Sequence, residues 1–155
     1  MKLIYFLLFV SPILFAQSNV LFIPLHEIED STEEKKTLEE FEKEYQPAGS
    51  FLNGDSISNA WFNSFNPKLK KIVSDSISII DKETKLWINL GCSSNGKIEK
   101  IIYFSNDLHT QNLDKRFQLL LTQFLENYSF PLKSGKRYSQ CGSFRFQPTK
   151  KDSLK

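Results

Sequence analysis

The sequence predicts an α+β fold, in which a three-stranded antiparallel sheet is covered by a helix and preceded by one or two N-terminal helices. Residues 86–90 alternate in polarity as a strand does. Asn95-Gly96 is typical of a hairpin turn, and apolar residues recur at helical spacing over 113–128. The order strand, hairpin, strand, helix, strand predicts that the third strand is parallel to the second, with the first strand between them.

The first sixteen residues are organised like a cleavable secretory signal peptide. Lys2 provides a positive start, residues 3–15 form an apolar run, and Ala16 is a small residue before a polar break. A membrane anchor is the alternative, because residues 20–25 are apolar again. However, two prolines and the break interrupt the roughly 20 apolar residues that a spanning helix needs. We therefore expect a periplasmic or secreted protein that meets a membrane only if the signal is uncleaved.

Residues 17–60 are predicted to be an acidic helical segment followed by a linker. The stretch 27–44 holds nine acidic residues and three lysines, a net charge of −6. Ser31 and Glu34 form a capping box at the start of the helix. This helix either docks on the more basic remainder of the chain or faces water, and the solvated helix is favoured. Turn-forming residues over 46–60 favour the linker.

Residues 61–147 are predicted to form the α+β domain with a leading helix, and 148–155 a polar tail. Pro67 suits the first turn of the leading helix. In the second strand the apolar spacing shifts between Ile98 and Ile101, which predicts a β-bulge. The 139 residues that follow the signal (155 minus 16) are enough for one domain with a modest core.

Cys92 and Cys141 are the two cysteines of the chain. In an exported protein this count suggests one disulfide, and the predicted topology brings the corresponding strand ends together. Cys92 shares a face with Leu90, whereas Cys141 lies opposite Phe144, so the bond requires a bulge at one of the neighbouring glycines. Two unpaired thiols are the alternative.

The chain contains no catalytic signature. No Gly-x-Ser-x-Gly elbow, phosphate loop or dinucleotide fingerprint occurs. Two cysteines and two histidines without ligand-like spacing do not predict a metal or another cofactor. We expect His26 and His109 to be ordinary surface residues. No strongly basic stripe with interleaved aromatics is present, which argues against a nucleic-acid partner.

A series of motifs runs through residues 86–147. They are, in order, an alternating strand leading into Asn95-Gly96-Lys97-Ile98, a helix, Tyr128-Ser129-Phe130-Pro131, Gly135-Lys136 and Phe144-Arg145-Phe146. With these motifs the stretch resembles the C-terminal domain of TonB-like proteins. The resemblance implies a protein-binding module of the bacterial envelope that adds an extended peptide to a sheet edge. The cleaved signal and the lack of a long Pro-Lys spacer depart from the energy-transducing members, so a transducer is not expected.

In the predicted strand order the exposed edges are 97–104 and 139–147. On the second edge, Ser143 and Arg145 are the candidate binding residues, because they lie opposite the buried phenylalanines. The predicted function is a non-catalytic, exported interaction module whose partner is a protein or peptide of the envelope. A periplasmic inhibitor or immunity-type protein is the alternative, and a small exported hydrolase is the third choice.

Trp87 is the third candidate binding residue. It alternates out of phase with Leu86 and Ile88, so it should lie on the sheet face away from the long helix. Either residues 67–80 cover it or it forms a binding surface. Cover is favoured because exposed apolar patches are uncommon.

Overall fold

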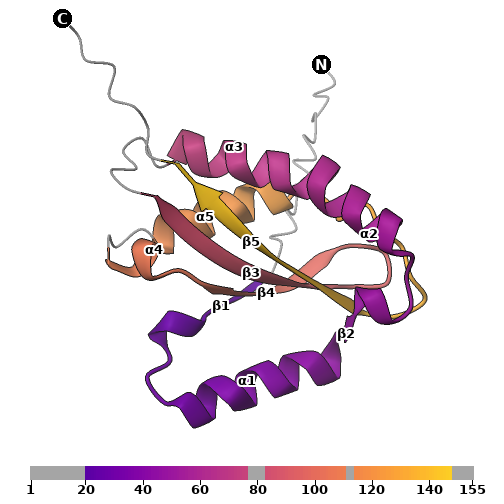
Figure 1. Cartoon of the computed structure of the whole chain (residues 1–155), viewed down its shortest axis with the longest axis horizontal. Helices are drawn as coiled ribbons and strands as arrows, with labels where there is room; N and C mark the ends of the chain where they lie inside the picture. The colour runs from indigo at the N-terminus through magenta and orange to yellow at the C-terminus, as the bar shows by residue number, and fades with distance from the viewer. Residues whose placement is uncertain (1–19, 77–82, 111–113, 148–155) are drawn as a thin grey trace, which may run out of the picture.

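The computed structural model describes residues 20–76, 83–110 and 114–147 (Figure 1). The predicted signal peptide, the polar tail and residues 77–80 of the second predicted helix lie outside them. The elements follow one another as β1 (Leu21–Pro24), η1 (Leu25–Glu27), α1 (Ser31–Glu44), β2 (Gln46–Pro47), η2 (Ala48–Ser50), α2 (Gly54–Asn59), η3 (Ala60–Phe65), α3 (Asn66–Ser76), β3 (Thr84–Cys92), β4 (Ile98–Phe104), α4 (Asn106–Thr110), α5 (Asp114–Leu125) and β5 (Tyr138–Phe146). Within this part of the chain, no helix is both long and apolar enough to cross a membrane.

The sheet is five-stranded and mixed, in the order β1-β4-β3-β5-β2, so the predicted three-stranded antiparallel sheet is wrong. β1 pairs in parallel with β4, and β2 pairs in parallel with Tyr138 and Ser139 of β5. β1 comes from the apolar residues after the predicted signal, and β2 from the segment predicted as a linker. Both strands are too short to show alternation. Each ends in a proline, which an edge strand tolerates because one side of its backbone has no partner strand.

The three central strands keep the predicted arrangement, with β3 between β4 and β5 and antiparallel to both. The predicted bulge is also confirmed. Gly91 is opposite Lys100 and Cys92 is opposite Ile98, which leaves Glu99 as the extra residue. The bulge therefore keeps the isoleucines at 98 and 101 buried on one face, while two consecutive charged residues reach the other.

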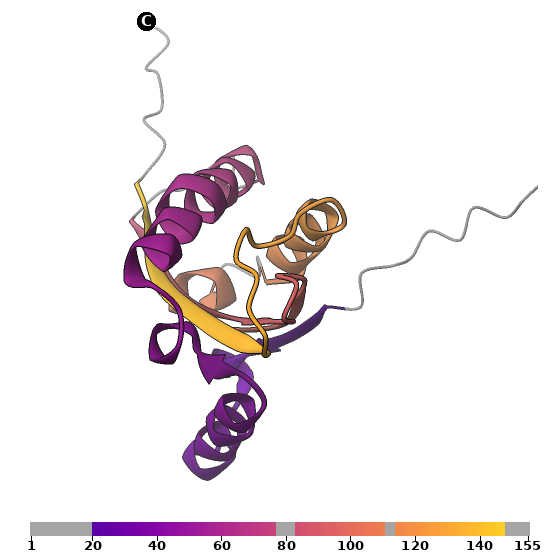
Figure 2. The same ribbon diagram turned by 90° about the vertical axis from the view of Figure 1, so that its right-hand side faces the viewer.

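One face of the sheet is covered by the continuous helical run α2–η3–α3 and by α5 (Figure 2). Asn53 caps this run, since its Oδ1 accepts from the amide of Asp55 at 2.8 Å. Phe65, at the end of the π-helical turn η3, is fully buried and contacts the rings of Trp61 and Phe144. We call this the closed face.

The opposite face carries α1 (Figure 2). The N-cap is Asp30, one residue before the predicted Ser31, and its Oδ1 accepts from the amide of Thr32 at 2.7 Å. Phe41 and Tyr45 are buried against the sheet, while most of the acidic residues remain exposed. The helix predicted to be solvated is therefore docked by its apolar stripe. We call this second face the α1 face.

Cys92 and Cys141 are both free, so the predicted disulfide is wrong. The β3–β5 ladder places Cys141 opposite Asn89, and Cys92 opposite Tyr138. The bond required a bulge in this ladder, which is instead regular from end to end, because the bulge lies between β3 and β4. Cys92 is consequently buried in the core of the closed face, and Cys141 is exposed.

Candidate functional site

A cleft of about 410 Å³ opens on the part of the α1 face that the helix leaves uncovered. Trp87 and Phe104 are cross-strand neighbours in it, and Phe104 is 41% exposed. These two rings give the cleft an apolar wall. Its lining residues are Lys85, Leu86, Trp87, Phe104, Asn106, Asp107, Ser143, Phe144 and Arg145.

All three candidate binding residues of the sequence line this cleft. In the register of β3 and β5, Trp87 is opposite Ser143 and Lys85 is opposite Arg145. Trp87 does lie away from the long helix, but residues 66–76 of α3 do not cover it, since α3 packs with α5 on the other face. It is half-buried against the cluster that holds Phe41.

The edge beyond β5 is largely open. β1 covers the outer edge of β4, so the predicted exposed edge at 97–104 is wrong. β2 covers β5 only at Tyr138 and Ser139, and over residues 140–146 no described strand pairs on the outer side. The side-chain amide of Gln140 donates to the carbonyl oxygen of Cys141 at 3.0 Å. Pro47 has no amide hydrogen, so its parallel pairing with Ser139 uses the amide and carbonyl of Ser139, which therefore point outward. Because backbone groups alternate along a strand, the amide and carbonyl of Cys141 point outward as well.

Two cations face each other across the cleft. Lys85 and Arg145 are directly opposite in the β3–β5 ladder, where like charges destabilise a pair. Glu83 approaches Arg145 at 4.0 Å, but the Arg145 side chain is 72% exposed and such a pair contributes little. Asp107 also lines the cleft, and its Oδ2 accepts from the backbone amide of Lys85 at 3.1 Å.

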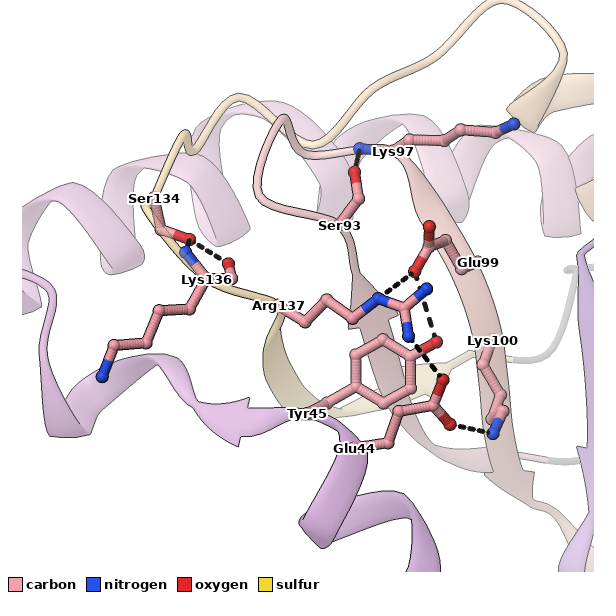
Figure 3. Close-up of polar contacts among 9 residues, drawn as sticks. All are labelled: Glu44, Tyr45, Ser93, Lys97, Glu99, Lys100, Ser134, Lys136 and Arg137. Atoms are coloured by element: carbon pink, nitrogen blue, oxygen red, sulfur yellow. Dashed lines mark hydrogen bonds and ion pairs between the residues drawn. The ribbon is translucent and has the colours of Figure 1, made fainter.

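The other end of the α1 face is closed by an ion-pair network (Figure 3). Glu44 pairs with Lys100 and, at 2.9 Å, with Arg137. Arg137 also lies 3.2 Å from Glu99, which accepts a 3.4 Å hydrogen bond from the hydroxyl of Tyr45. The hydrogen bond from Lys100 holds the pKa of Glu44 below its ordinary value, and burial raises the pKa of Tyr45. The network fixes the end of α1 to β4 and to Arg137, the residue before β5.

A buried polar cluster joins η1 to α5. Contrary to the sequence prediction, the side chain of His26 is only 2% exposed. Its Nε2 lies 3.1 Å from Oδ1 of Asp114, which also accepts a 3.0 Å hydrogen bond from the hydroxyl of Tyr103. Its Nδ1 accepts from the backbone amide of Ser105 at 3.3 Å. The prediction for His109 concerns a side chain outside the described part of the chain.

His26, Glu27 and Asp114 bring candidate metal ligands within 4.8 Å of one another. The histidine geometry does not suit a metal there. Because Nδ1 accepts the amide hydrogen of Ser105, the neutral ring carries its own proton on Nε2, which faces the aspartate. A metal on Nε2 would need that proton removed. The arrangement instead acts as a polar clamp between two elements.

Among the lining residues that were not predicted from the sequence are Lys85, Phe104 and Asp107. Phe104 is the last residue of β4 and is placed beside Trp87 by the β3–β4 register. Lys85 has the same parity as Trp87, and that parity was the available signal for it. Asp107 comes from α4, and no local pattern points to its place in the cleft.

No protein-family model matches the chain, and neither a curated protein nor a solved structure does. The resemblance of residues 86–147 to the TonB C-terminal domain therefore stays a prediction.

Proposed function

We propose that this chain is a non-catalytic binding module of the bacterial envelope that holds an extended peptide of a partner protein along the outer edge of β5. The observation that carries the proposal is the meeting of an open edge and a cleft. Residues 140–146 have no described strand partner on their outer side, and Ser143 and Arg145 line both that edge and the cleft.

Strand addition uses both features. Main-chain hydrogen bonds to the free side of β5 supply affinity, and alternate side chains of the added strand face the cleft and supply specificity. The resemblance to TonB-like domains favours the same mode of binding. The signal-like residues 1–16 favour export, so the proposed partner is a protein or peptide of the envelope.

The test begins with selection of binders from a phage library of random dodecapeptides, followed by hydrogen exchange of the protein with each selected peptide. Because the backbone groups of Ser139 point outward and such groups alternate along a strand, the amide of Ser143 also points outward. We expect the selected peptides to slow exchange at Ser143 and Arg145. Protection confined to another surface, or no enrichment of binders, would overturn the proposal.

The matched variants are Ser143→Pro and Phe62→Ala. A proline at 143 removes an outward donor while sparing the ladder to β3, which an edge strand tolerates. We expect it to abolish binding of the selected peptides with an unchanged circular dichroism spectrum. Phe62 is 62% exposed and lies on η3, away from the cleft, so its substitution should leave binding unchanged. If the proline variant does not fold, hydrogen exchange on the unaltered protein still shows whether the peptides bind along β5.

A further inference from the structure

The cleft carries charge in a pattern that the sheet itself does not explain. Lys85 and Arg145 face each other on adjacent strands, and both project from the α1 face beside the rings of Trp87 and Phe104. An isolated sheet gains nothing from two cations in this position. A bound anionic group offsets this repulsion and adds to the pair of Arg145 with Glu83, which at 4.0 Å contributes little. Asp107, the acidic residue of the cleft lining, accepts from the backbone amide of Lys85 through its Oδ2.

The rows of the cleft define a spacing. Lys85 and Arg145 form one row, and Trp87 and Ser143 form the next row two residues along each strand. A strand added beside β5 repeats this period, so its side chains at positions i and i+2 face the two rows. Ser143 is small and leaves room for a large side chain to extend towards Trp87.

We infer that the ligand is an acidic extended peptide, with an aspartate or glutamate two residues from a large apolar side chain. The carboxylate lies at the Lys85–Arg145 row, and the apolar group lies over Ser143 towards Trp87 and Phe104. This inference rests on the proposed strand addition at β5 and names the chemical class of the peptide that β5 takes.

The test uses acetylated, amidated octapeptides of threonine and valine with a phenylalanine and a glutamate two residues apart, made in both orders. Twin peptides carry glutamine in place of glutamate. Binding is followed by tryptophan fluorescence, and its position by hydrogen exchange at β5. We expect one of the glutamate peptides to bind about five- to ten-fold more tightly than its twin, as two partly exposed ion pairs predict. This preference should shrink as salt is added.

The double variant Lys85→Gln, Arg145→Gln should bind both twins equally. Lys133→Gln, an exposed lysine that does not line the cleft, should keep the full preference. These two variants separate a local contact from the general charge of the protein.

Each contrary result has its own meaning. If the twins protect β5 equally, the acidic preference is wrong and the proposed strand addition stands. If neither twin nor any library peptide protects β5, the proposed function fails as well. If an oligothymidylate displaces the peptides and binds more tightly than they do, the cleft is a nucleic-acid site and the inference is wrong.

Discussion

The two faces of the sheet differ in how they are covered and in what they leave free. The closed face meets α2–η3–α3 and α5 through fully buried aromatic rings. The α1 face is covered at one end only, where Tyr45 and four charged side chains hold the helix, and its other end is the cleft. The more fully packed side and the proposed binding cleft therefore lie on different faces of one sheet.

The alternation of side chains along each strand produces this difference between the two faces. In β3, Leu86, Ile88 and Leu90 are buried on the closed face. Lys85 and Trp87 alternate with them and line the cleft. A substitution at one residue thus tests one face, and its neighbour in the strand tests the other.

The largest effect is expected from Phe65→Ala. This ring is 0% exposed and contacts five other rings on the closed face. Its removal leaves a cavity, and we expect the free energy of unfolding in urea to fall by about 3–5 kcal/mol. Phe62→Ala, on the same element, is the control, because an exposed ring should change stability by no more than about 0.5 kcal/mol. Equal losses would show that η3 is not packed as described.

The next prediction compares glycine-to-alanine substitutions, which add one methyl group on each face of the sheet. At Gly142 a Cβ would lie 2.1 Å from Trp61 Cζ2, and at Gly91 it would lie 2.8 Å from the Tyr45 ring. Overpacking of this kind costs about 1–3 kcal/mol. We expect Gly142→Ala to approach the upper end and Gly91→Ala the lower end, measured by thermal unfolding. Gly49→Ala, where nothing lies within 4 Å of the added atom, is the control. The reverse order would mean that the α1 face is the tighter one.

The central sheet was predictable because its signals are local. Alternation found β3, the shifted spacing found the bulge at Glu99, and the connection rule placed β3 between its neighbours. The outer strands were not predictable. β1 and β2 pair with residues far along the chain over a few positions, and so short a strand carries no period of its own.

The site was predictable in part for the same reason. Parity alone placed Trp87, Ser143 and Arg145 on one face, and the register then brought them together. The buried His26 was missed because its partner Asp114 lies far along the chain and no spacing links them. The predicted disulfide failed because it needed a further bulge between β3 and β5, where the pairing is regular.

A smaller effect is expected where charge holds the α1 face. The pKa of Glu44 is lower in the folded protein than its ordinary value of 4.5, chiefly because of the hydrogen bond from Lys100. The ion pairs therefore stabilise the fold above about pH 4.5, and this contribution is lost as the pH falls through the lowered pKa. Glu44→Gln should cost about 1 kcal/mol at pH 7.

The difference between Glu44→Gln and the unaltered protein should shrink as the pH falls below about 4.5, and it should disappear once the carboxylate is protonated in both the folded and the unfolded state. Urea unfolding across this pH range measures it. Glu40→Gln removes an exposed pair with Lys36 on the same helix, at 3.9 Å, and should change stability by no more than about 0.5 kcal/mol. A difference at Glu44 that does not shrink as the pH falls below 4.5 would assign its effect to packing and not to charge.

The two cysteines allow the two faces to be compared by chemical reactivity, with no change to the sequence. Cys92 is buried in the closed face, and burial raises the pKa of its thiol to about 12. The thiol therefore stays protonated at neutral pH and is shielded from reagents. Cys141 is exposed on the open edge of β5. Brief treatment with iodoacetamide, read by mass spectrometry, should label Cys141 in the folded protein and Cys92 only in urea. A peptide added along β5 should slow the labelling of Cys141, whereas two thiols of equal reactivity would contradict the assignment of one cysteine to each face.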